Sequence, residues 1–182
     1  PASLTDYGDY LFAYCTNLAK VTLPANMTRI GTYSFAGCTA LAAINLQNVK
    51  YIGDYAFTSC KALTNLNLGA ATPGVNLPEA EAIGLGAFAD TAVAGAMSAP
   101  KLTKVGDYAF QNAGLTSVDA PNLTTIGRAA FQMNKSLTEF TFNPEITKIG
   151  MLAFQGCTSL RSFYATVDGQ KLATYATDDG YL

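Results

Sequence analysis

The stretch IGDYAFTSCKALTNLNL, residues 52–68, contains a glycine, a phenylalanine, a cysteine and a leucine at spacings that recur along the chain. The glycine and phenylalanine occur together seven times, and successive glycines lie 23, 22, 31, 22, 21 and 23 residues apart. A regular period of roughly 20 to 29 residues predicts a solenoid, in which each repeat forms one coil and neighbouring coils stack. The repeat glycines are Gly8, Gly31, Gly53, Gly84, Gly106, Gly127 and Gly150.

Two apolar columns, each made of one position from every repeat, predict the core. A single coil cannot bury its own apolar face, so stacked copies of one position form a continuous internal ladder. The first column is Phe12, Phe35, Phe57, Phe88, Phe110, Phe131 and Phe154. The second column is Leu18, Leu41, Leu63, Ala94, Leu115, Leu137 and Leu160.

Each repeat also predicts two extended segments. After the second column, apolar and polar residues alternate, as around Leu66 and Leu68, which is typical of a half-buried strand. Stacking would join these strands into a parallel sheet. A further apolar residue lies four positions before each glycine and predicts a short extended segment on the other wall. The glycine then favours a sharp turn or a positive φ, and we expect the AFxxC segment to form one helical turn.

The pattern L-T-x-I-G-x-x-A-F-x-x-C-x-x-L-x-x-φ-x-φ-P resembles the BspA-type leucine-rich repeat of bacterial surface proteins, and the resemblance covers residues 4–164. Thr91, Ala113 and Asn134 depart from it by replacing the cysteine, and Ala94 by replacing the leucine. The resemblance implies a secreted or surface-displayed protein that adheres through protein contacts. The expected fold is a leucine-rich-repeat solenoid of seven coils of about 22 residues. It would have a short parallel sheet on one face, short extended segments and helical turns on the other, and a C-terminal hairpin cap.

Composition limits the classes of partner. Charged residues make up 13% of the 182 residues and the net charge is −2, without a basic patch, so nucleic acid and anionic membrane are not expected partners. No apolar run approaches the ~18 residues of a membrane span. No signal peptide is present, and the chain opens at LTDYG in mid-repeat. We therefore expect a trimmed or processed chain whose export signal lay upstream.

The four cysteines occupy one repeat position, three residues after the column phenylalanine, where other repeats carry small or medium residues. This favours buried free thiols that pack as small hydrophobic side chains. A disulfide between neighbouring coils is a second possibility, although side chains of one ladder point the same way. A zinc site is disfavoured, because no C-x-x-C pair exists. The cysteines are Cys15, Cys38, Cys60 and Cys157.

The sequence predicts neither an enzyme nor a cofactor or metal site. Histidine is absent, which removes the commonest general base and the Ser-His-Asp and Cys-His arrangements within this chain. Glu79 with Glu81, and Asp178 with Asp179, are pairs that could suggest a glycosidase dyad. We interpret both pairs as solvated surface charge.

The polar residues of the strands after the second column are the candidate binding residues, because stacking would place them side by side on one face. Protein adhesion is the first hypothesis, with an extracellular or host protein as partner. A glycan-binding module is an alternative, although this face shows no row of aromatic residues. A structural spacer is a second alternative. The candidates are Lys20, Thr22, Asn45, Asn65, Asn67, Ser98, Ser117, Asp119, Glu139, Thr141 and Tyr164.

The repeat is broken at two places. The 31-residue step is nine longer than the 22-residue step and predicts an insertion within residues 69–82, which would be either a spacer or a binding loop. Near the C-terminus, Asp168-Gly169 between two alternating segments predicts a hairpin. We therefore expect one domain, with the solenoid at residues 1–161 and a hairpin cap at residues 162–182. The start of a following module is the alternative interpretation of residues 162–182.

Overall fold

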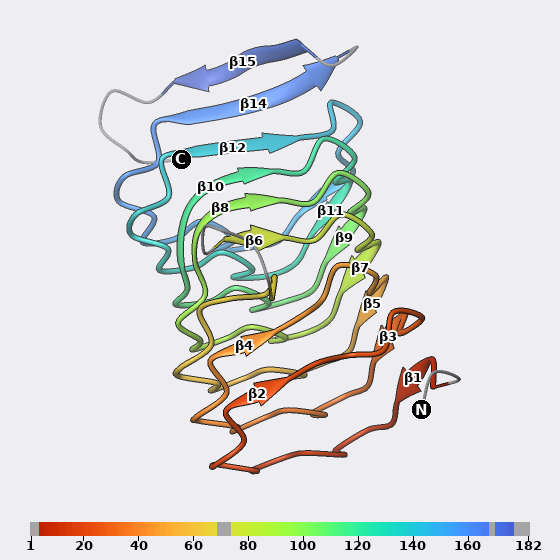
Figure 1. Ribbon diagram of the computed structural model, residues 1–182. Coiled ribbons are helices and arrows are strands. Elements are labelled where there is room, and N and C mark those ends of the chain that lie inside the picture. The colour runs from red at the N-terminus through yellow and green to blue at the C-terminus, as the bar shows by residue number, and fades with distance from the viewer. Residues whose placement is uncertain (1–3, 69–73, 168–169, 177–182) are drawn as a thin grey trace.

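The seven repeats form stacked coils (Figure 1) in a computed structural model that describes residues 4–68, 74–167 and 170–176. The predicted solenoid of about 22 residues per coil is confirmed. The first coil lies at one end of the stack and the C-terminal hairpin at the other, so each middle coil packs between two neighbours.

The segments that precede the repeat glycines form a continuous parallel sheet of seven short strands, in which each strand pairs with those of the adjacent coils. This segment is therefore the uninterrupted wall of the solenoid. The strands are β1 (Asp6–Tyr7), β3 (Arg29–Ile30), β5 (Tyr51–Ile52), β7 (Ala82–Ile83), β9 (Lys104–Val105), β11 (Thr125–Ile126) and β13 (Lys148–Ile149).

The segments after the second column form two sheets instead of the single sheet that stacking predicts. One contains β2 (Lys20–Val21) and β4 (Ala43–Ile44). The other is six-stranded and contains β6 (Val75–Asn76), β8 (Ala94–Ser98), β10 (Gly114–Asp119), β12 (Glu139–Phe142), β14 (Ser162–Val167) and β15 (Gln170–Ala176).

The interruption lies in the third coil, the one with the insertion. Asn65 forms one isolated bridge to Ala43 in the coil before, whereas Val75 and Asn76 pair with β8 in the coil after. The insertion thus separates a segment at Asn65, which pairs with the coil before, from β6, which pairs with the coil after. β6 and the first residue of β7 lie within residues 69–82, so part of that range is regular coil.

The C-terminal hairpin is confirmed. β14 pairs in parallel with β12 and antiparallel with β15, and Val167 is the partner of Gln170. β15 is therefore the last strand of the six-stranded sheet (Figure 1). Asp168 and Gly169, the predicted turn residues, lie outside the described residues.

The predicted helical turn is wrong, because the AFxxC segments are chains of tight turns and the described residues contain no helix. In the second coil, Tyr33 and Gly37 have φ of 54° and 69°, two residues before and after Phe35. The backbone N–H groups of these three residues donate to carbonyls of the next coil at 2.8 to 2.9 Å. With these two positive φ values, every second N–H group points along the stack, whereas the N–H groups of a helical turn donate within the same turn.

The phenylalanine column forms the predicted internal ladder. Phe35, Phe57, Phe88, Phe110 and Phe131 are fully buried, and neighbouring rings stack with centroids 5.2 to 5.5 Å apart. The second column needs one correction, because Ala94 is exposed and Val93 is fully buried in its place. The corner before β8 is one residue shorter than in most coils, which shifts the inward position.

The repeat glycines are required for close packing and not for a positive φ, which none of them has. A Cβ atom on Gly106 would lie 2.6 Å from the carbonyl carbon of Gly84, and one on Gly53 would lie 2.7 Å from that of Gly31. Gly8, in the first coil, would meet nothing within 4 Å. The glycine column therefore allows the backbones of neighbouring coils to approach each other closely.

The cysteine position supplies a hydrogen-bond donor as well as small size. The Sγ atoms of Cys38, Cys60 and Cys157 each donate to the carbonyl of the column phenylalanine in the coil before, at 3.0 to 3.1 Å. Asn134, at the same position, donates its amide to Phe110 O at 2.7 Å. These three cysteines are buried free thiols, as predicted.

Cys15 is exposed, which corrects its predicted burial. It belongs to the first coil, which packs against only one other coil among the described residues. Burial raises the pKa of the Cys60 thiol to about 12 and that of Cys157 to about 11. These two groups therefore stay protonated at neutral pH and suit a structural role.

Candidate functional site

The candidate residues of the strand face lie in register along the stack. In the six-stranded sheet, Asn76, Ser98 and Asp119 are successive partners, and all three are exposed. A second row contains Ala96, Ser117, Glu139 and Ser162. Lys20 and Thr22 are exposed on the first coil, and Asn45, Asn65 and Tyr164 are half-buried.

Two candidate residues do not face solvent. Asn67 is 4% exposed and Thr141 is 1% exposed, which contradicts their prediction as outward-facing residues. Asn67 lies just before the insertion, and Asn76 occupies the row position next to Ser98 in its coil. The alternation of apolar and polar residues does not show that the exposed row position lies after the insertion, at Asn76, and not before it, at Asn67. Asn76 was therefore missing from the predicted residues.

Glu79 and Glu81, one of the two carboxylate pairs, each form an ion pair with a lysine on the surface. Glu79 accepts two hydrogen bonds from Lys101 Nζ at 2.7 and 2.8 Å. Glu81 accepts one from the Tyr51 hydroxyl at 2.6 Å and pairs with Lys50 at 3.2 Å. The hydrogen bond from Tyr51, then that from Lys50, lowers the pKa of Glu81. The Glu81 carboxylate therefore stays charged at neutral pH. Asp178 and Asp179 lie outside the described residues.

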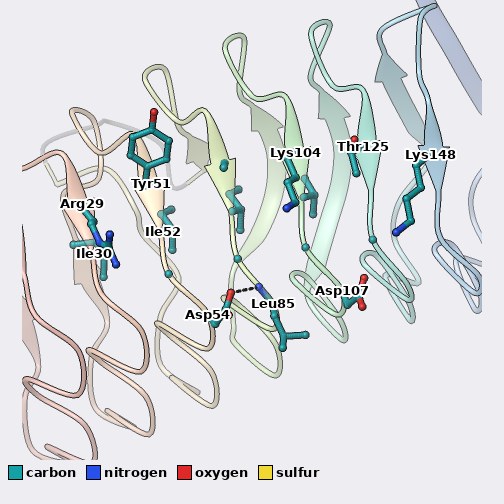
Figure 2. Close-up of a pocket in the computed structure, with 17 residues that line it drawn as sticks. Arg29, Ile30, Tyr51, Ile52, Asp54, Leu85, Lys104, Asp107, Thr125 and Lys148 are labelled. Atoms are coloured by element: carbon teal, nitrogen blue, oxygen red, sulfur yellow. Dashed lines mark hydrogen bonds between the residues drawn. The ribbon is translucent and has the colours of Figure 1, made fainter.

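A second surface, which sequence reasoning missed, crosses the outer side of the seven-stranded sheet (Figure 2). It is a groove of about 520 Å³, and we call it the glycine groove because Gly53, Gly84, Gly106 and Gly127 line it between two rows of side chains. One row is Arg29, Tyr51, Ala82, Lys104, Thr125 and Lys148, which are successive strand partners. The other row contains Asp54, Leu85 and Asp107.

The two rows of the glycine groove carry opposite charges. Within the described ranges Lys104 and Lys148 form no ion pair, and Arg29 has only an exposed contact with Asp6 at 3.7 Å. Asp54 Oδ1 accepts a hydrogen bond from the backbone N–H of Leu85 at 2.8 Å, and Asp107 Oδ1 accepts one from the backbone N–H of Arg128 at 2.7 Å. These bonds fix both carboxylates at the edge of the groove (Figure 2).

A row of aromatic residues exists, but on the turn segments and not on the strand face. Tyr10, Tyr33 and Tyr55 stack with ring centroids 5.0 and 4.8 Å apart. The Tyr55 ring then covers Gly86, where a Cβ atom would lie 2.6 Å from it. Because the rings cover one another, the inner faces of this stack are not available to a ligand.

The described residues offer no metal centre, since they contain no group of three or more histidine, cysteine, aspartate or glutamate side chains suited to an ion. The same part of the chain contains no helix of the length and apolarity that a membrane span requires. The polar groups on the two surfaces are hydroxyl, amide, carboxylate, ammonium and guanidinium groups.

Comparisons agree with the repeat architecture. The family model described as BspA type leucine rich repeat region (6 copies) matches residues 1–77 and 69–179. No curated protein matches the chain. A leucine rich repeat protein of T. pallidum is similar in structure, with a TM-score of 0.70 and 23% identity over 86% of this chain and 72% of its own.

Two larger proteins are also similar. A leucine rich cell surface protein of Faecalibacterium prausnitzii has a TM-score of 0.74 and 26% identity over 95% of this chain. A leucine-rich repeat protein of Bacteroides ovatus has a TM-score of 0.71 and 25% identity over 88% of it. The chain spans 47% and 40% of the lengths of these two proteins.

Proposed function

Because this chain belongs to the BspA-type leucine-rich-repeat family, we propose that it is a non-enzymatic protein that binds a macromolecular partner at the cell surface or after secretion. The proposed partner is an extracellular or host protein, and the proposed site is the strand face. One structurally similar protein is named a cell surface protein, which supports the location. The family relationship supports binding as the general activity.

The observation that carries this proposal is the in-register array of exposed polar residues on the strand face. Asn76, Ser98 and Asp119 stand side by side on strands that the buried phenylalanine ladder holds in place. Six strands at ~4.8 Å spacing give a sheet on the order of 25 Å wide. That width suits a standard protein interface of about 800 Å² per partner.

The array contains few charges, which determines how strongly binding should depend on salt concentration. Its residues are mainly hydroxyls and amides, which recognise a partner through hydrogen bonds and not through a strong electrostatic field. Binding should therefore depend only weakly on salt concentration. The glycan-binding alternative is favoured by a different surface, the glycine groove. A structural spacer would capture no partner at all.

The triple variant Asn45→Lys, Asn76→Lys and Asp119→Lys should abolish capture of the partner and keep the fold. All three side chains are at least partly exposed, and three large cations would disrupt a neutral interface by charge and size. Capture from a panel of extracellular-matrix proteins would measure binding, and thermal melting would check the fold.

A control variant with the same charge change elsewhere is Asn48→Lys, Gln155→Lys and Asp90→Lys, at exposed positions outside the strand face. It should capture the partner as the unmodified protein does. If the strand-face variant retained full capture, the site would lie elsewhere and the proposal would be wrong.

A further inference from the structure

The glycine groove has the features of a second binding site, independent of the strand face. Its middle lacks side chains because the close approach of neighbouring coils excludes a Cβ atom at Gly84, Gly106 and Gly127. A ligand can therefore lie directly over the backbone. The charged groups stand on either side of this backbone strip, in the arrangement that Figure 2 shows.

The backbone of the groove cannot pair with an extended peptide. The N–H groups of Gly53, Gly84, Gly106 and Gly127 already donate to the strand carbonyls of the preceding coil at 2.8 to 2.9 Å. Peptide recognition by strand addition needs unpaired backbone groups at a sheet edge. The groove crosses the middle of a sheet instead, so side chains must recognise the ligand.

The cations of the groove are spaced along one line. Lys104 and Lys148 are two coils apart, or about 10 Å at the usual strand spacing, and Arg29 lies three coils before Lys104, or about 14 Å. A linear ligand with anionic groups at intervals would meet these cations in turn. Tyr51, between Arg29 and Lys104, is 47% exposed, and the bond of its hydroxyl to Glu81 fixes its ring.

The opposite row favours a ligand that also carries hydroxyl groups. Asp54 and Asp107 each use Oδ1 for a backbone N–H, and Oδ2 makes no hydrogen bond within the described part of the chain. A carboxylate oxygen accepts hydrogen bonds from sugar hydroxyls. Internal nucleotides of single-stranded DNA have no free sugar hydroxyl and cannot make these hydrogen bonds.

We propose that the glycine groove binds a linear acidic polysaccharide. Lys104, Lys148 and Arg29 would contact its carboxylate or sulfate groups, Asp54 and Asp107 would accept hydrogen bonds from its hydroxyls, and a sugar ring would pack on Tyr51. An acidic polysaccharide can be a sulfated glycosaminoglycan or a polyuronate. Both present the same chemistry to the groove.

Calorimetric titration of the full chain tests the proposal, with heparin oligosaccharides, oligogalacturonate, neutral cello-oligosaccharides and single-stranded DNA as probes. At least one acidic glycan should bind, more weakly as salt is raised, and the better one identifies the source. The neutral glycan and the DNA should bind much more weakly. Failure of both acidic glycans to bind, or tighter binding of the neutral glycan or of DNA, would overturn the proposal.

The double variant Lys104→Gln and Lys148→Gln should weaken glycan binding by about five- to thirtyfold, the effect expected of two exposed ion pairs. Lys61→Gln with Lys135→Gln removes the same charge from exposed positions outside the groove and should leave the affinity unchanged. Equal effects of the two variants would show that only net charge matters. Unchanged binding in the first would place the glycan elsewhere, and either outcome would reject the groove.

Discussion

Replacing Phe110 by alanine is expected to lower the free energy of unfolding by about 3 to 5 kcal/mol. The side chain is fully buried, and its ring stacks between those of Phe88 and Phe131 at 5.2 and 5.5 Å. Its removal leaves a cavity in the middle of the ladder that rigid neighbouring coils cannot fill. Equilibrium urea denaturation, followed by circular dichroism, measures the loss.

Phe12→Ala is the matched control for this prediction. Phe12 is only partly buried and stacks on Phe35 from the end of the ladder, so its replacement should cost less than half as much. Amide hydrogen exchange in the Phe110 variant should rise most in the adjacent coils, because the stability of a solenoid depends on contacts between neighbours. A loss below about 1 kcal/mol at Phe110 would show that the ladder is not the main stabilising element.

Replacing Gly106 by alanine is expected to cost about 1 to 3 kcal/mol, the usual range for inserting a methyl group into a packed interior. The new Cβ atom would lie 2.6 Å from the carbonyl carbon of Gly84 and 2.7 Å from the backbone nitrogen of Leu85. Both are backbone atoms, which cannot rotate away, so the two coils must separate. Urea denaturation again measures the change.

Gly8→Ala provides a control at the same repeat position. A Cβ atom there meets nothing within 4 Å and the φ of Gly8 is not positive, so the fold should tolerate it. Restricting the unfolded chain would give a gain of about 0.4 to 1 kcal/mol. If the two variants lowered the free energy of unfolding equally, the close stacking of coils would not be the reason why glycine occurs at this repeat position.

Periodicity predicted the features that recur identically in every coil. The phenylalanine column and the number of coils follow from spacing, because each position meets the same environment in successive coils. The hairpin follows from a local pattern instead, an Asp-Gly pair between two alternating segments. Two of the errors lie where one coil departs from the others. The shorter corner moves Val93 into the place predicted for Ala94, and the insertion gives Asn76 the row position predicted for Asn67.

Other features depend on contacts between coils, which one repeat does not reveal. The glycines looked like turn residues, although the backbone of the coil before explains them. The cysteine position looked purely apolar, but Asn134 shows that it also supplies a donor to a phenylalanine carbonyl. The glycine groove had a signal in the sequence, since Arg29, Lys104 and Lys148 all lie two residues before a repeat glycine.

The most direct test of the strand face as the binding site is to block it with a bulky group. A Ser98→Cys variant in a Cys15→Ser background has one exposed thiol in the described residues, because Cys38, Cys60 and Cys157 are buried. The control is Gln155→Cys in the same background, on a turn segment. After reaction with a polyethylene-glycol maleimide, the Ser98→Cys protein should lose capture of its partner and the Gln155→Cys protein should retain it. Retained capture by the labelled Ser98→Cys protein would contradict the account.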